Sequence, residues 1–136
     1  MTLELRATPE EVMRGVEALQ AYGEEREINS KTLFGLTLAL EECASNIVNH
    51  ALQRDATRSF QVSFDTVGGR VVIELRDSGP EFDPTAKPDR EPSPDDDDEP
   101  PGGWGIQLVR RYTDEIHYAR PPGENVLRLI KNPATT

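Results

Sequence analysis

Three polar residues recur at helical spacing in the middle of the chain: Glu42, Asn46 and Asn49. At about 100° per residue they fall within an arc of roughly 60° on one side of a helix. A carboxylate and a carboxamide one turn apart can act together on a bound ion or a hydroxyl group. The same pattern also fits an ordinary solvated helix face, so features elsewhere in the chain must distinguish the two interpretations.

The helix that carries these residues is expected to span Leu36–Leu52. Its apolar residues lie opposite the polar arc and should face a core: Leu33, Leu40, Ala44, Ile47 and Ala51. Asn29 or Ser30 can cap its start. An earlier helix is predicted from Thr8-Pro9-Glu10-Glu11, which has the form of a capping box, to about Arg26.

Alternating apolar residues predict strands on either side of these helices. The segments are a short strand at Leu3–Arg6, a hairpin of Ser59–Asp65 and Val71–Leu75 around Val67-Gly68-Gly69, and a final pair at Ile116–Tyr118 and Val126–Lys131. Ile106, Val109 and Tyr112 predict a helix to about Asp114 before that pair. The order predicts an α+β fold, a two-layer α/β sandwich whose mostly antiparallel sheet carries helices on one face.

Length and composition suggest one domain spanning 1–136. The net charge is −10, and residues 81–99 hold nine acids against two basic residues. Such a surface disfavours nucleic acid and anionic membranes as partners. The N-terminal residues do not resemble a signal peptide, and no apolar run reaches membrane-spanning length, so a cytoplasmic protein is expected. Cys43, the one cysteine, is expected to be a small buried hydrophobe.

Two further stretches stand beside predicted elements. Asp77-Ser78-Gly79-Pro80 directly follows a predicted strand, and Gly102-Gly103-Trp104-Gly105 directly precedes a predicted helix. Glycines at a helix entry let backbone amides approach phosphate closely, and the helix dipole favours the negative charge. The lysine and hydroxyl residue of a Walker A loop are missing. Between the two stretches, the proline-rich and acidic segment 84–101 has little to bury and is predicted to be flexible, as a functional lid or as a disordered insert.

Together these motifs resemble the GHKL ATPase superfamily, specifically its small anti-sigma-factor serine/threonine kinase branch with a histidine kinase-like ATPase domain. Glu42 and Asn46 match the first family box, Glu-x-x-x-Asn, within the longer helical motif at Ala39–Ala51. Asp77–Pro84 matches Asp-x-Gly-x-x-Phe-Asp-Pro in full. Gly102–Arg110 with the later Asp114 matches Gly-Gly-x-Gly-Ile-x-Leu-Val-Arg. Where the family often carries a threonine before its last strand, this chain has Gly123-Glu124-Asn125, which leaves open any polar contact from that strand to Asp77.

The resemblance implies ATP and Mg²⁺ as cofactors. Asn46 would be the magnesium ligand, Asp77 would accept from the adenine amino group, and Gly79 would let the base approach the backbone. Glu42 would be the general base toward a substrate serine or threonine. The other residues that the resemblance places at the nucleotide are Asn49, Phe82, Gly102, Gly103, Trp104, Gly105 and Ile106. For His50, a structural role is favoured over a catalytic one.

The implied substrate is a small anti-sigma-factor antagonist of the STAS type, with a sigma factor as a second partner and a homodimer as a common assembly in this branch. The alternative is a nucleotide-dependent binding module with little or no kinase activity. Glu42 favours the kinase because binding alone needs no base. The acidic lid favours the module because negative charge opposes a triphosphate.

Overall fold

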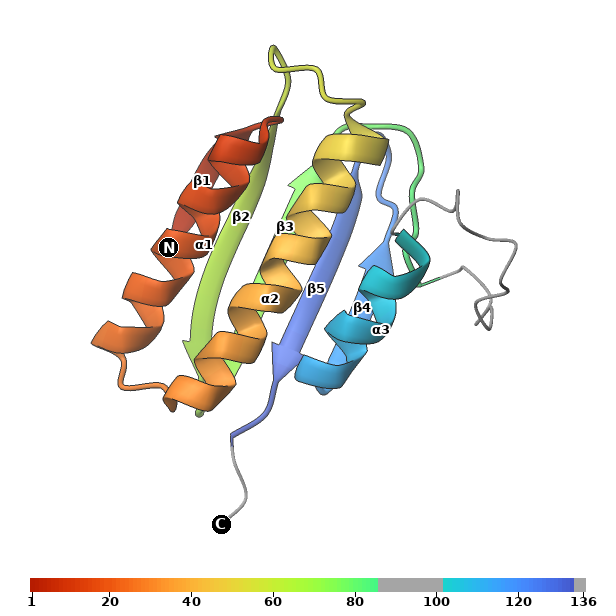
Figure 1. Ribbon diagram of the computed structural model, residues 1–136. Helices are drawn as coiled ribbons and strands as arrows, with labels where there is room; N and C mark the ends of the chain where they lie inside the picture. Colours follow the sequence, from red (N-terminus) through yellow and green to blue (C-terminus); the bar gives the residue numbers. More distant parts are fainter. Residues whose placement is uncertain (86–101, 134–136) are drawn as a thin grey trace, which may run out of the picture.

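Five strands form one antiparallel sheet, and three α-helices cover one of its faces, in the part of the chain that the computed structural model describes (Figure 1). The described residues are 1–85 and 102–133, and residues 102–105 are described by their backbone alone. The predicted two-layer α/β sandwich is therefore confirmed. The predicted lid at 84–101 lies outside this description, apart from Pro84 and Thr85.

The elements follow the predicted order. Most of their first and last residues lie within a few residues of the predicted ones. They are β1 (Thr2–Arg6), α1 (Pro9–Glu25), α2 (Ser30–Asn46), a π-helical turn η1 (Ile47–Ala51), β2 (Ser59–Val67), β3 (Arg70–Asp77), α3 (Gly102–Tyr112), β4 (Glu115–Ala119) and β5 (Asn125–Lys131). No described helix combines the length and apolar character needed to cross a bilayer.

Side-chain caps fix where the first two helices begin. Thr8 Oγ1 accepts from the Glu11 amide at 3.2 Å, and Pro9 occupies the first turn. The return bond of a capping box reaches further than expected, because Glu11 Oε1 accepts from the Arg6 amide instead of the Thr8 amide. Asn29 caps α2 by accepting from the Lys31 and Thr32 amides. Both helix starts are thus determined by local sequence.

The core lies between the inner face of the sheet and the helices. Its largest fully buried side chains include Phe60 and Phe64 of β2, Ile73 of β3 and Leu129 of β5. The β2–β3 hairpin turns at Gly68 and Gly69, whose φ values of +58° and +82° suit glycine. The alternation in the sequence therefore predicted the buried face correctly.

The end of the central helix differs from the expected regular helix to Leu52. The α-helical part stops at Asn46, and Ile47–Ala51 form a wider π turn in which the Leu52 amide donates to the Ile47 carbonyl at 2.8 Å. Ile47, Val48 and Ala51 are all buried in this turn. The wider turn changes the rotation per residue, so the predicted polar arc does not continue unchanged to Asn49.

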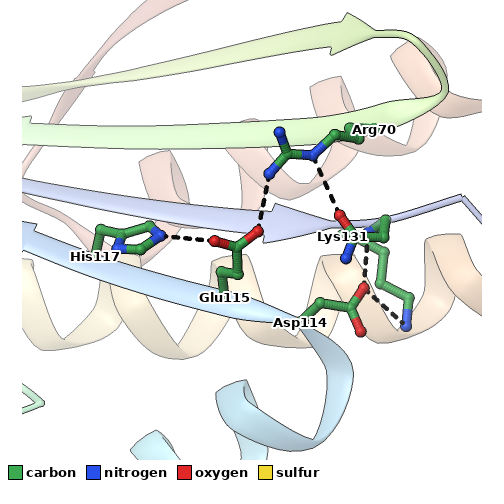
Figure 2. A network of polar contacts seen from close by, with 6 residues as sticks. Arg70, Asp114, Glu115, His117 and Lys131 are labelled. Carbon is green, nitrogen blue, oxygen red and sulfur yellow. Dashed lines mark hydrogen bonds and ion pairs between the residues drawn. The ribbon is translucent and has the colours of Figure 1, made fainter.

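The sheet order β1-β2-β3-β5-β4 places β5 between β3 and β4. Side chains of all three strands meet near the C-terminal end of β5 (Figure 2). Arg70 Nη2 donates to Glu115 Oε2 at 2.8 Å, Glu115 Oε1 lies 3.1 Å from His117 Nε2, and Lys131 Nζ lies 3.7 Å from Asp114 Oδ2. Exposed pairs of this kind each contribute little stability. The same register that pairs β3 with β5 at this end of the sheet also pairs Asp77 with Asn125 at the other end.

Candidate functional site

Asp77, the last residue of β3, faces Asn125, the first residue of β5. The two are register partners, and both are buried, with 5% and 4% of their surfaces exposed. Asn125 Nδ2 donates to Asp77 Oδ1 at 2.9 Å, and the Gly79 amide donates to the same oxygen at 2.8 Å. A buried carboxylate needs such donors. Both contacts use Oδ1, so Oδ2 is the oxygen that could serve a ligand.

Asn125 is the site residue that sequence reasoning missed. The absence of the family's threonine left a polar contact from the last strand to Asp77 open, and the structure shows that Asn125 makes it. Two signals could have revealed it. Asn125 is in phase with the inward-facing Leu127 and Leu129, and a polar residue on a buried face requires a partner.

A small cavity of about 20 Å³ connects Asp77 to the central helix. Its lining consists of Cys43, Asn46, Ile47, Leu75, Asp77, Phe82, Pro84, Tyr118, Asn125 and Leu127. This volume holds about one water molecule, whereas ligand pockets usually measure hundreds of Å³. A purine base would therefore have to displace part of the wall, and Phe82 and Pro84 form the wall on the loop side.

The central helix contributes Asn46 and Cys43 to the cavity lining, and Glu42 precedes Asn46 by one turn. Glu42 is half-buried, and burial raises its pKa above the ordinary 4.5, with the neighbouring Glu41 charge adding to the effect. Burial raises the pKa of the Cys43 thiol to about 12. The expectation that Cys43 is a small buried hydrophobe is confirmed, since it is buried in the core. The raised pKa makes Glu42 a stronger base than a solvated glutamate.

Asn49 and His50, near the end of this helix, lie outside the cavity lining. Asn49 is exposed, and its Oδ1 accepts from Arg54 Nε at 2.9 Å, so it does not line the cavity. His50 stacks on Phe82 with ring centroids 5.6 Å apart and an interplanar angle of 16°. This contact fits the structural role expected of His50 and holds Phe82 at the cavity edge.

The glycine-rich stretch lies inside α3 and not before it, because α3 begins at Gly102. Gly102–Gly105 therefore form the first turn, whose amides have no partner within the helix. Figure 1 shows α3 running beside α2 in the opposite direction. A Cβ on Gly35 would lie 2.4 Å from the Tyr112 ring, so the N-terminal part of α2 closely contacts the end of α3. Moving about 15 Å along both helices reaches Asn46 and the first turn of α3.

Ile106 belongs to the core of this arrangement, with 5% of its surface exposed. The structure thus brings together the side chains of Asn46, Asp77 and Phe82, with Glu42 one turn away. It orients the first turn of α3 toward the same end of α2. Acceptor oxygens on one side and the first-turn amides of a helix on the other suit a ligand with an amino-bearing head and an anionic tail.

Gly79 packs directly against the π turn. A Cβ at this position would lie 2.6 Å from the Ala51 carbonyl oxygen and 3.0 Å from Asp77 Oδ1. The backbone carbonyl cannot move aside as a flexible side chain would. Glycine is therefore required here for close contact between the Asp77 turn and η1, whether or not a ligand is bound.

Gly79→Ala is expected to destabilise the fold by about 1–3 kcal/mol, since the added methyl group overpacks a site bounded by backbone. Urea denaturation followed by circular dichroism measures the effect. Ser78→Ala, at the exposed neighbouring position, is the matched control and should change stability by less than about 0.5 kcal/mol. Equal unfolding midpoints for Gly79→Ala and the native protein would contradict the tight contact.

Comparison with known proteins places this arrangement in a recognised group. Residues 5–131 match the family model described as histidine kinase-like ATPase domain. The serine/threonine-protein kinase BtrW of Bordetella bronchiseptica is 29% identical over 106 residues, which are 78% of this chain and 75% of that protein.

Two solved structures share the fold, each with a TM-score of 0.69. One contains the RsbU and RsbW domains of Rv1364c from Mycobacterium tuberculosis, at 17% identity over 97% of this chain and 32% of that chain. This protein thus spans about a third of that longer chain. The other is the SiaB–SiaC complex from Pseudomonas aeruginosa, at 12% identity over 96% of this chain and 88% of that chain.

The family model covers every element that lines the cavity, from α2 to β5. The resemblance drawn from the three sequence motifs is thereby confirmed. The chain belongs to the family of histidine kinase-like ATPase domains.

Proposed function

We propose that this protein is an ATP-dependent serine/threonine kinase of the anti-sigma-factor type. The observation that supports this most directly is the shared cavity of Asp77 and Asn46, with Glu42 one helical turn from Asn46. A nucleotide-binding family and similarity to a serine/threonine kinase agree with this proposal.

ATP would span the site from β3 to the start of α3. Asp77 Oδ2 would accept from the adenine amino group, and the backbone amides of Gly102–Gly105 would donate to phosphate oxygens. Asn46 suits the magnesium ion because it offers one amide oxygen, half-buried at the cavity edge, and magnesium usually takes few protein ligands. When bound, the ion would neutralise charge on the phosphates.

Glu42 would remove the proton from the hydroxyl of the protein substrate. That oxygen would then bond to the γ-phosphorus, while the bond from phosphorus to the β,γ-bridging oxygen breaks and ADP leaves. A carboxylate with a raised pKa suits the task because its basicity is greater than that of a solvated glutamate. Glu42 is half-buried one helical turn from Asn46, whereas Asn49 on the same predicted arc is exposed.

The proposed substrate is a serine or threonine of a small anti-sigma-factor antagonist of the STAS type, with a sigma factor bound in a second complex. The M. tuberculosis structure contains an RsbW domain, and the P. aeruginosa structure is a complex of SiaB with SiaC, so related folds occur in multi-domain and partner-bound forms. Dimer formation by this chain is part of the same proposal.

Incubation with γ-labelled ATP, magnesium and purified antagonist proteins tests the proposal. Label on a serine or threonine of one antagonist, located by mass spectrometry, is the expected result. ATP binding without transfer to any antagonist would favour the nucleotide-dependent binding module. Absence of ATP binding would contradict both functions.

Asn46→Ala is expected to weaken nucleotide binding about tenfold in the presence of magnesium, because the substitution removes the proposed metal ligand. Without magnesium, native protein and variant should bind ATP equally weakly. Titration calorimetry with and without magnesium measures both affinities. Asn132→Ala is the matched control, since its side chain accepts from Arg70 Nε at the opposite end of β3, away from the cavity. If magnesium increases the ATP affinity of Asn46→Ala as much as that of the native protein, Asn46 is not a magnesium ligand.

A further inference from the structure

Three residues of the β4–β5 hairpin reach the turn that follows β3. Tyr118 lies in β4, Arg120 follows that strand, and Asn125 begins β5. Each of them bonds to the turn itself or to another residue that does. The hairpin therefore holds the Asp77 turn through side chains, in addition to the backbone pairing of β5 with β3.

Asn125 makes the most contacts in this group. Its Nδ2 donates to Asp77 Oδ1 at 2.9 Å and to the Pro80 carbonyl at 2.8 Å. Its Oδ1 accepts from the Phe82 amide at 3.0 Å and from the Tyr118 hydroxyl. One buried amide thus uses both its donor and its acceptor groups on the turn and the hairpin.

The arginines hold the outer side of the same turn. Arg120 Nη1 donates to the Gly79 carbonyl at 2.9 Å, and Arg58 Nη2 donates to the Ser78 carbonyl at 3.2 Å. Arg58 directly precedes β2 and Arg120 directly follows β4, and these two strands lie on opposite sides of β3 in the sheet. The carbonyls from Ser78 to Pro80 are therefore engaged by side chains without any ligand.

An asparagine is not required at this position for packing. The inward-facing neighbours on β5, Leu127 and Leu129, are apolar, and an apolar residue would continue that face. Burying a carboxamide is costly unless its groups are bonded. The bonds that compensate for its burial run to Asp77 and its turn, so the side chain serves the turn and not the core.

We propose that Asn125 is the positioning residue for base recognition, and this inference rests on the proposed nucleotide function. It holds Asp77 with Oδ1 engaged, so that Oδ2 is directed to the ligand as a pure acceptor. A pure acceptor favours a base with an amino group, such as adenine, and rejects one with a carbonyl at that place, such as guanine. Loss of Asn125 frees the carboxylate to rotate and loosens the turn, so selectivity between the two bases falls.

The test is titration calorimetry of Asn125→Leu with magnesium-ATP and magnesium-GTP. The leucine variant should lose ATP affinity about tenfold and change GTP affinity less than about twofold, so that discrimination falls about tenfold. Asn125→Thr, which retains a donor and an acceptor, should recover part of the discrimination. A general loosening of the fold would lower the affinities for ATP and GTP alike and leave the ratio of the two affinities unchanged.

Arg128→Leu is the matched control, because it makes the same kind of change on the exposed side of β5, where Arg128 pairs with Glu74. It should leave the ATP-to-GTP ratio within about twofold of the native value. Tyr118→Phe provides a second variant that keeps the core packing and removes only the hydroxyl bonded to Asn125. It should lower the ratio about threefold.

An unchanged ratio in folded Asn125→Leu would overturn the inference. If the leucine variant does not fold, an unchanged ratio in Tyr118→Phe would overturn it instead. Failure of the proposed function looks different, because the native protein would then bind neither nucleotide. A native protein that prefers ATP while Asn125→Leu retains that preference leaves the proposed function in place and removes Asn125 from base recognition.

Discussion

Glu42→Gln is expected to reduce phosphoryl transfer to the antagonist protein by about a hundredfold or more, because glutamine keeps the size and polarity of the side chain but cannot accept the proton. Nucleotide affinity should remain within about twofold of the native value, since Glu42 does not line the cavity. Single-turnover transfer measures the first quantity, and calorimetry with magnesium-ATP measures the second.

The pH dependence of transfer gives an independent test of Glu42. Burial raises its pKa above 4.5, and the base must be ionised, so activity should be lost as the pH falls through that raised value. Glu41→Gln is the matched control on the same helix. It removes the neighbouring negative charge that raises the Glu42 pKa, so the acidic limb of the profile should move to lower pH while the plateau rate stays nearly constant.

These two measurements separate a base from a positioning residue. A Glu42→Gln variant that transfers phosphate at the native rate would contradict the assignment directly. If Glu42 is the base, Glu42→Gln must also lose the fall in activity at acidic pH. A variant that is less active but keeps the native pH profile would therefore show that Glu42 acts by positioning and not as the base.

The fold was predictable from sequence because each of its elements carries its own local pattern. Leu3 and Leu5 alternate in β1, Phe60 and Phe64 do so in β2, and Thr8 with Pro9 starts α1; the structure agrees in each case. Local patterns of this kind depend on residues close together in sequence. They were therefore sufficient for the element order and for the buried face of each strand.

The parts that could not be predicted depend on contacts between distant residues. Alternation in β3 and β5 does not reveal that the two strands are neighbours, so the pairing of Asp77 with Asn125 was not expected. Likewise, no proline or glycine marks the π turn at Ile47–Ala51, which leaves Asn49 exposed and bonded to Arg54. Its predicted part in nucleotide binding remains a prediction.

Asp77→Asn is expected to weaken magnesium-ATP binding by about ten- to a hundredfold. Asp77 Oδ1 already accepts from the Gly79 amide and from Asn125 Nδ2. In the variant, the carbonyl oxygen of the new amide must keep these two donors, because its NH₂ group cannot accept them. The NH₂ group is therefore forced toward the ligand, where it meets the adenine amino group, and an unmet donor pair costs about 1–3 kcal/mol.

The structural contacts of the turn survive in this variant, so the thermal unfolding midpoint should change little while ATP affinity falls. Asp83→Asn is the matched control, since Asp83 follows in the same loop and uses one oxygen, Oδ1, to bond Thr85. It should bind magnesium-ATP within about twofold of the native protein. Native ATP affinity in a folded Asp77→Asn variant would mean that Asp77 does not contact the base. An equal loss in both variants would assign the effect to loop charge, because the two substitutions remove the same charge from one loop but the proposal assigns contact with adenine to Asp77 alone.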